Sequence, residues 1–328
     1  MIISRTPFRI SLGGGGTDLE SYYSRHGGFI FAASINKYMY IFLNQPAVDS
    51  MIRVKYSQSE IVEDVSQLKH KVAKASLEKV GITKGIEICS IADIESGTGL
   101  GSSSVYTVGL LNALHNLQRD YRPLQDLAEE AYLLEKTHFN PSVGKQDHYM
   151  AAFGGLQVLD IAKDGKVKVR PAKISSLLLN ELNRNTLIFF TGTTRSSGEI
   201  LTHQSNAAKE ANSPVTESMH KIKELGYQIL EEMERGNLDA FGTLMHEHWE
   251  AKKKISTKMA NARHHQLYDI ARENGALGGK IIGAGGGGFL IFYTPNKQTQ
   301  LRKAMLAEGL QELDYRFDLE GTKPLVDF

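Results

Sequence analysis

Glycine is concentrated in three short clusters, and no other feature of the sequence constrains the fold as strongly. The clusters cover residues 13–18, 96–104 and 283–288. Glycine lets the backbone adopt positive φ and approach another group closely, whereas inside a helix or strand it costs stability. Three clusters in one chain therefore predict three loops whose backbones crowd around a common ligand.

The second cluster carries the clearest signal for phosphate binding. Alternating glycines are followed by three serines, and apolar residues then recur at helical spacing from Val105. A glycine loop that runs into a helix N-terminus directs free N–H groups and the positive end of the helix dipole at an anion. Serine hydroxyls add donors and a ligand for Mg²⁺. The alternative is a serine-capped helix entered through a tight turn. The loop comprises Gly97, Gly99, Leu100, Gly101, Ser102, Ser103 and Ser104.

Other nucleotide-binding motifs do not fit the sequence. A Walker A loop needs a Gly-Lys-Ser/Thr string, which is absent. Gly283, Gly285 and Gly288 satisfy G-x-G-x-x-G, but the apolar runs on both sides predict strand, loop and strand. A dinucleotide site needs a helix after the loop. Taken alone, the third cluster also fits a tight connection between two strands.

The remaining pattern predicts two α+β domains. A length of 328 residues suits two cores. The first part of the chain is rich in strand-forming residues, with separate strands expected over Phe29–Ser34 and Tyr38–Asn44. We place the boundary between about Lys173 and Asn185, which gives domains 1–180 and 181–328. Long helices are expected at about Gly198–Ala211, Pro214–Glu234, Leu238–Lys254 and Ala260–Asn274.

Bulk composition excludes several classes of function. A net charge of +1 offers no basic excess for nucleic acid. The single Cys89 cannot form an internal disulfide, and no Cys/His metal motif is present. A membrane span needs roughly 20 apolar residues, and neither such a run nor the apolar core of a signal peptide occurs. The sequence therefore predicts a soluble, cytoplasmic protein that binds neither nucleic acid nor membrane.

Two groups of charged or ligating residues are predicted to have no role in a site. His246 and His248 are two apart on an expected helix, so they face different sides and form a poor metal pair. The run Lys252-Lys253-Lys254 is interpreted as a solvated helix end, where lysines suit the helix dipole.

The order and spacing of these elements resemble the GHMP kinase superfamily. Its first motif resembles Pro7–Leu12 with the glycines that follow, its second resembles Gly99–Ser103, and its third resembles 283–289. The segment Gly144–Asp147 resembles the catalytic-aspartate region of the superfamily. The resemblance implies an N-terminal domain like ribosomal protein S5 domain 2, a ferredoxin-like C-terminal domain, and ATP bound between them.

The first motif also resembles one subfamily, the D-glycero-D-manno-heptose 7-phosphate kinases. These enzymes phosphorylate an anomeric hydroxyl, which implies a sugar phosphate as acceptor and ATP with Mg²⁺ as donor. Galactokinases have Gly-Glu-His-Thr-Asp where this chain has 14–18. Fucose kinase domains share parts of the pattern, so a free sugar is an alternative acceptor. A non-catalytic sensor that binds ATP and sugar on the same fold is the alternative from another class.

The resemblance implies a role for several residues. Asp147 would act as the base, Arg9 would stabilise negative charge beside it, and Glu135 with Ser103 would hold Mg²⁺. A substrate phosphate needs a cationic pocket, for which hydroxyls and a guanidinium in one loop favour Arg195, with Lys145, Arg53 and Lys55 as rivals. The chain is expected to be a monomer or homodimer. The predicted substrate-binding residues are Gly15, Gly16, Thr17, Asp18, Arg195, Gly285 and Gly286.

Overall fold

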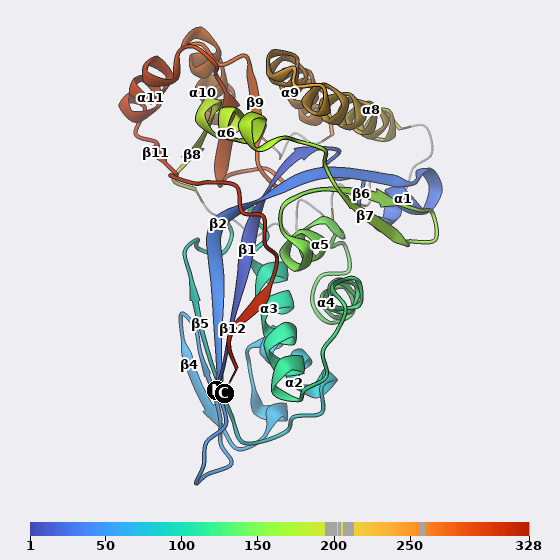
Figure 1. The fold of residues 1–328 in the computed structure, drawn as a ribbon, viewed down its shortest axis with the longest axis vertical. Coiled ribbons are helices and arrows are strands. Elements are labelled where there is room, and N and C mark those ends of the chain that lie inside the picture. The colour runs from blue at the N-terminus through green and yellow to red at the C-terminus, as the bar shows by residue number, and fades with distance from the viewer. Residues whose placement is uncertain (194–201, 203–204, 206–212, 256–259, 328) are drawn as a thin grey trace.

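The first half of the chain builds one large mixed sheet. The computed structural model describes residues 1–193, 202, 205, 213–255 and 260–327. The sheet has the order β12-β1-β2-β5-β3-β4, and β6 and β7 extend it beside β2 (Figure 1). All pairs are antiparallel except β3 with β5. The strands are β1 (Ile2–Gly13), β2 (Gly28–Asn44), β3 (Ile52–Lys55), β4 (Ser59–Val62), β5 (Ile86–Ala92), β6 (Leu156–Ile161), β7 (Val167–Pro171) and β12 (Lys323–Asp327).

Strand β2 corrects one prediction from the sequence. The expected strands Phe29–Ser34 and Tyr38–Asn44 are a single strand of 17 residues. Its first half pairs with β6 and its second half with β5, while β1 pairs along both halves. The polar residues in the middle therefore mark a change of neighbour on one edge and leave the strand continuous.

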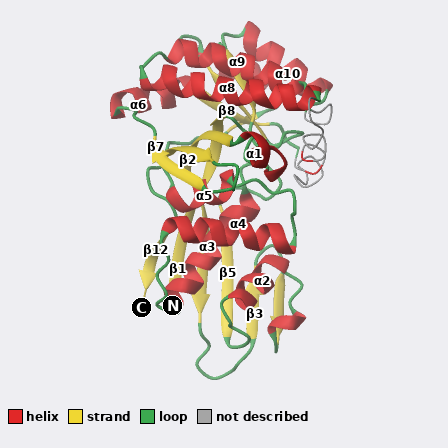
Figure 2. Ribbon diagram, turned by 90° about the vertical axis from the view of Figure 1, so that its right-hand side faces the viewer, coloured by secondary structure: helices red, strands yellow, loops and turns green. Residues whose placement is uncertain are grey.

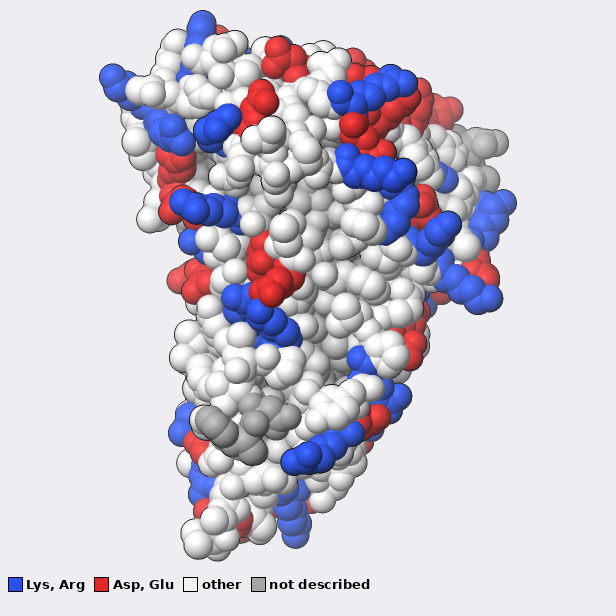
Figure 3. Space-filling view, in the orientation of Figure 1, with Lys and Arg blue, Asp and Glu red and all other residues white. Residues whose placement is uncertain are grey.

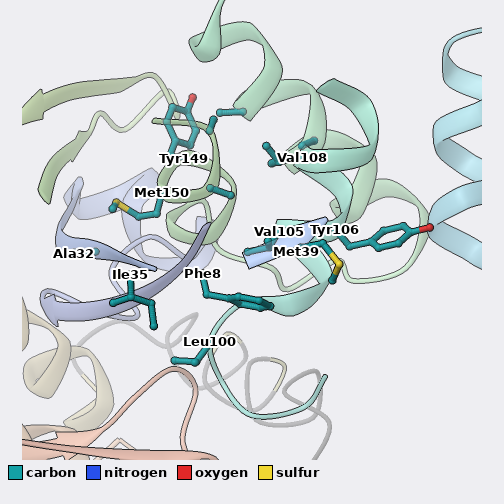
Figure 4. Close-up of a cluster of buried hydrophobic side chains, with 14 of the residues drawn as sticks. Phe8, Ala32, Ile35, Met39, Leu100, Val105, Tyr106, Val108, Tyr149 and Met150 are labelled. Atoms are coloured by element: carbon teal, nitrogen blue, oxygen red, sulfur yellow. The ribbon is translucent and has the colours of Figure 1, made fainter. Parts of the chain in front are cut away.

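Four helices cover one face of this sheet. In α3, Val105 and Val108 are buried and belong to the same apolar cluster as Phe8 of β1 and Met150 of α5 (Figure 4). Burying one such side chain contributes roughly 1.5–3 kcal/mol. The helices are α2 (Lys71–Lys79), α3 (Ser102–Leu117), α4 (Leu124–His138) and α5 (Gln146–Phe153); a short α1 (Glu20–His26) and a 3₁₀ turn (Val65–Gln67) lie elsewhere.

A second sheet with its own helices forms the rest of the molecule. It is antiparallel, with the order β11-β8-β10-β9, and α8, α9 and α10 lie across the top of the molecule in Figure 2. Three of the four long helices expected in the second half are confirmed to within two residues, and the fourth, about Gly198–Ala211, lies mostly outside the described residues. The elements are α6 (Ser176–Asn185), β8 (Thr186–Phe190), α8 (Pro214–Glu234), α9 (Leu238–Lys253), α10 (Ala262–Glu273), β9 (Gly278–Ile281), β10 (Phe289–Tyr293), α11 (Gln298–Ala307) and β11 (Gln311–Glu312).

The two α+β units predicted from the sequence are confirmed, and they share a continuous core. Buried residues of α8 and α9 belong to the same apolar cluster as β1 and β2. Strand β12 pairs with β1, so the end of the chain returns to the first sheet, and the two termini lie side by side (Figures 1 and 2). The proposed division after residue 180 falls within α6 and stays a prediction.

None of the helices in the described ranges is long and apolar enough to cross a bilayer. On the face drawn in Figure 3, basic and acidic side chains are interspersed, in keeping with the net charge of +1.

Candidate active site

A cavity of about 950 Å³ opens where the two units meet. All three glycine clusters contribute to its lining, together with the N-terminal ends of α3 and α5 and the C-terminal end of α9. The prediction that three glycine loops surround one space is therefore confirmed by their placement. A volume of this size is typical of sites for small-molecule ligands.

The second cluster forms an anion-binding loop at the start of α3. Gly97, Gly99 and Gly101 all have φ between 80° and 85°, the left-handed region that favours glycine. Gly101 is the N-cap of α3, and no side chain caps this helix. The first N–H groups of α3 are therefore left for a ligand, and the serines of its first turn line the cavity beside them.

The third cluster packs backbone against backbone on the second. A Cβ built on Gly283 would collide with the carbonyl group of Gly99, and one on Gly99 would lie 2.8 Å from the carbonyl oxygen of Ile282. A Cβ on Gly288 would likewise collide with the backbone of Thr98. These glycines are needed because the two loops approach more closely than any side chain allows. The third loop thus supports the second.

Arg9 and Asp147 form an ion pair at the entrance to this loop. The Arg9 Nε and Nη2 atoms lie 2.7 Å and 2.6 Å from Asp147 Oδ1, and Nη1 donates to the carbonyl oxygen of Gly99 at 3.0 Å. The side-chain amide of Gln146 donates to the same Oδ1 at 3.1 Å. The other carboxylate oxygen, Oδ2, is the atom nearest to a Cβ built on Gly101, at 2.9 Å. Asp147 therefore keeps Oδ2 beside the anion-binding loop.

Asp18 joins the first glycine cluster to α5. Its Oδ2 accepts a hydrogen bond from the backbone N–H of Gln146 at 2.9 Å, and its Oδ1 accepts from that of Gly16 at 3.2 Å. Burial raises the pKa of Asp18, and the negative charge of Asp147 acts in the same direction. Asp18, Gly15 and Gly16 all line the cavity, as predicted for residues that contact a substrate.

Other predicted contact residues do not line the cavity. Thr17 is fully buried; its hydroxyl lies within hydrogen-bond distance of the carbonyl oxygens of Gly14 and Phe29, and it accepts from the Phe29 N–H. The side chain of Leu100 belongs to the core drawn in Figure 4, so Leu100 contributes only its backbone to the anion-binding loop. Gly285 and Gly286 lie next to the lining residues of their cluster. Arg195 lies outside the described residues.

Glu135 lines the cavity, and two neighbours hold one of its carboxylate oxygens. Its Oε2 accepts from the Ser104 hydroxyl at 2.9 Å and lies 2.8 Å from His148 Nε2. The Ser104 hydroxyl is thus hydrogen-bonded to Glu135, whereas Ser103 is exposed and lines the cavity. One carboxylate oxygen and one hydroxyl fit Mg²⁺, which binds few protein oxygens and completes its shell with water and phosphate. No cluster of three or more acidic, His or Cys ligands occurs in the part of the chain described.

Another part of the lining is apolar and aromatic, and sequence reasoning did not find it. The rings of Tyr56 and His70 meet edge to face at 4.5 Å, and His70 lies 5.1 Å from the ring of Tyr106. Burial lowers the pKa of His70 and so favours its neutral ring. These residues come from three separate segments, so no local pattern joins them. The wall continues with Met39, Val72, Ala92 and Ile94.

The rival candidates for a phosphate pocket are already paired with carboxylates. The Lys145 ammonium is buried and lies 2.6 Å and 2.7 Å from the two carboxylate oxygens of Glu129. Arg53 and Lys55 lie on β3, form ion pairs there and do not line the cavity. The structure therefore does not support these three as free cations at the site.

Lys252 corrects the interpretation of the lysine run as a solvated helix end. It is 6% exposed, lines the cavity and donates to the carbonyl oxygen of Gly283 at 2.6 Å. The helical period was the signal that could have found it, because Phe241, Met245 and Trp249 form the buried stripe of α9 and Lys252 continues that stripe.

Two protein-family models match the chain on either side of this cavity. The model for the N-terminal domain of GHMP kinases matches residues 66–155, and the model for their C-terminal domain matches residues 229–310. Together the two matches span more than half of the 328 residues. The N-terminal match contains the glycine cluster at 96–104, and the C-terminal match contains the cluster at 283–288.

Individual proteins are similar over nearly the whole chain. A Campylobacter jejuni protein named D-glycero-alpha-D-manno-heptose 7-phosphate kinase is 29% identical over 98% of both chains. The structure of a D-glycero-D-manno-heptose 1-phosphate kinase from Bacteroides thetaiotaomicron has a TM-score of 0.83, with 25% identity and full coverage of both chains. A fucokinase/guanylyltransferase from Bacteroides fragilis is 24% identical over 97% of this chain, which spans 37% of that longer protein.

Proposed function

The chain belongs to the GHMP kinases, a family of ATP-dependent phosphotransferases, and we propose that it phosphorylates the anomeric hydroxyl of a sugar phosphate. The reaction is supported above all by the Arg9–Asp147 ion pair beside the uncapped N-terminus of α3. The proposed acceptor is D-glycero-D-manno-heptose 7-phosphate, which would give the 1,7-bisphosphate. The Campylobacter jejuni relative, similar over 98% of both chains, supports this choice.

The donor would lie along the cavity with its phosphates on the second glycine loop. The N–H groups at the start of α3 suit the negative charge of the phosphates. The apolar wall with Tyr56, His70 and Tyr106 suits a planar purine base. We assign the N-terminal domain 1–180 to the phosphate loop and the C-terminal domain 181–328 to the third loop that supports it.

The acceptor hydroxyl would lie between Asp147 and the second loop. Asp147 Oδ2 would accept the proton of this hydroxyl, or orient the hydroxyl, while Oδ1 is held by Arg9. Phosphoryl transfer depends mainly on such positioning and on neutralising phosphate charge. Asp18, Gly15 and Gly16 would bind the sugar, with the carboxylate of Asp18 accepting from its hydroxyls.

Mg²⁺ would be held by Glu135 and Ser103 together with phosphate oxygens. When bound, the ion neutralises charge on the phosphates. Within the protein, Ser104 and His148 hold the Glu135 carboxylate through its Oε2, and Glu135 lines the cavity.

A free sugar remains the second candidate acceptor. The fucokinase relative supports it, as does the pairing of Lys145, Arg53 and Lys55 with carboxylates. The third candidate is a sensor that binds ATP and sugar without turnover. The position of Asp147 Oδ2 beside Gly101 of the phosphate loop argues against a sensor.

An acceptor panel tests the proposal directly. Purified protein with Mg-ATP is assayed for ADP release against heptose 7-phosphate, mannose 6-phosphate, fucose, galactose, mevalonate and homoserine. We expect the highest kcat/KM with heptose 7-phosphate and a product whose new phosphate is labile in acid. Highest turnover with fucose would favour the free sugar. ATP binding without ADP release from any acceptor would favour the sensor.

A further inference from the structure

Lys252 carries a buried ammonium group in the lining of the cavity. Its one hydrogen bond in the described part of the chain goes to the neutral carbonyl of Gly283, at 2.6 Å. No carboxylate there forms an ion pair with it, although Asp18 is near enough to favour its charged form. A buried charge without a partner costs several kcal/mol in real proteins, so such a group usually serves a ligand.

Lys145 provides the internal comparison. It too is buried beside the cavity, but the two carboxylate oxygens of Glu129 and the ring of Tyr132, at 4.4 Å, satisfy its charge. Lys252 has no such partners, and its ammonium keeps donors that the carbonyl of Gly283 does not use. Of these two buried lysines, only Lys252 can offer its charge to an anion in the cavity.

The position of Lys252 indicates which anion it serves. It is held against Gly283, which packs on Gly99 of the anion-binding loop, and Gly99 in turn accepts from Arg9. We infer that Lys252 is a further substrate-binding residue whose ammonium donates to a phosphate oxygen where the second and third glycine loops meet. The inference rests on the proposed phosphoryl transfer, but it does not depend on which acceptor is used.

The surroundings of Lys252 make its charge sensitive to pH. Burial and the positive charge of Arg9 on β1 lower the pKa of Lys252 to about 8, and Asp18 of the first loop opposes them. Lys280 on β9 and His248 on α9 itself are the other titratable groups that act on this cluster. The ammonium is charged below its pKa, so its hydrogen bond to phosphate is lost as the pH rises above about 8.

The test compares two neighbouring lysines of α9. Lys252→Met removes the buried charge and keeps an unbranched side chain, whereas Lys253→Met removes a surface charge that pairs with Glu250 at 2.6 Å. We expect Lys252→Met to lower kcat/KM by about 10- to 100-fold, the usual effect of losing a charged hydrogen bond. Lys253→Met should stay within about twofold of the wild type, as exposed ion pairs contribute little.

Two binding measurements identify the source of the phosphate. Weaker binding of Mg-AMPPNP by Lys252→Met, with unchanged binding of Mg-ADP, would assign Lys252 to the terminal phosphate of ATP. A higher KM for a phosphorylated acceptor, but not for a free sugar, would assign it to the phosphate of the acceptor. The nucleotide measurement needs no acceptor, so it remains decisive even if the acceptor panel refutes a sugar phosphate.

The pH profile separates this role from a structural one. In the wild type kcat/KM should fall above about pH 8, and in Lys252→Arg this fall should disappear because a guanidinium stays charged. The arginine variant also decides the matter if Lys252→Met does not fold. The inference is overturned if the Lys252 and Lys253 variants behave alike in binding and turnover, or if Lys252→Arg keeps the fall above pH 8.

Discussion

The contact between the second and third glycine loops can be tested by adding a single methyl group. In Gly283→Ala the new Cβ would lie 3.0 Å from both the Cα and the carbonyl carbon of Gly99, and closer still to its oxygen. Carbon atoms in contact are normally about 3.5–4.0 Å apart, so one loop must move by roughly 0.5–1 Å. Because the obstacle is backbone, no side-chain rotation can relieve it.

A second glycine separates this collision from the cost of the backbone conformation. Gly283 has φ 76° and Gly81 has φ 74°, but a Cβ on Gly81 meets nothing within 4 Å. Both alanine variants should lose about 1–2 kcal/mol of folding free energy, since both force an L-residue into the left-handed region. Only Gly283→Ala should also displace the phosphate loop, and a misplacement of about 1 Å can cost about 10²-fold in rate.

The assay pairs thermal unfolding with ADP release and Mg-AMPPNP binding. Gly81→Ala should lower the thermal midpoint but leave kcat/KM for ATP within about twofold of the wild type. Gly283→Ala should lower the midpoint at least as much and reduce kcat/KM by about 10²-fold. Equal kinetics in the two variants would show that the third loop does not position the second, and our reading of the site would fail.

Three further substitutions, with one control variant, test the proposed base, the proposed metal site and the buried Lys280. Asp147→Asn should lower kcat by about 10³-fold and leave Mg-AMPPNP binding unchanged. The control Asp164→Asn, on the exposed β6–β7 turn, should change neither quantity. Normal turnover in Asp147→Asn would refute the proposed base. Glu135→Gln should raise the Mg²⁺ concentration for half-maximal activity by about 10-fold, and an unchanged Mg²⁺ titration would remove Glu135 from the metal site. Burial holds the pKa of Lys280 well below its ordinary value of 10.5. In the wild type the free energy of unfolding therefore decreases as the pH falls below 10.5, because the unfolded chain then binds a proton that the buried lysine resists. The thermal midpoint of Lys280→Met relative to the wild type should therefore be highest at neutral pH and decline towards pH 10.5; a difference that does not vary with pH would contradict this.

Much of the fold was predictable because its signals are local. The helix Pro214–Glu234 begins and ends where its apolar spacing and its proline indicate. The loop and helix at the second glycine cluster follow from glycines and serines that are adjacent in the chain. Strand β2 was misread as two strands because continuity depends on β1, a partner that the local pattern does not reveal.

The site was only partly predictable, since pairing between distant residues decides which charges are free. Lys145 and Lys252 carry the same side chain, yet within the described ranges Lys145 is paired with Glu129 and Lys252 donates only to a carbonyl group. Thr17 belongs to the first motif, but its hydroxyl is already hydrogen-bonded to the backbone. No spacing in the sequence distinguishes these cases.

The sequence by itself determined the three glycine loops, the two α+β units and the family, because φ preference, helical period and motif order are properties of neighbouring residues. Tertiary structure alone decided that Gly283 packs against Gly99, that Asp147 turns Oδ2 towards Gly101, and that Lys252 is buried against the carbonyl group of Gly283. These features join residues more than 100 positions apart or belong to helix faces whose burial depends on another sheet. Their energies arise from desolvation and close packing, which exist only once the chain has folded.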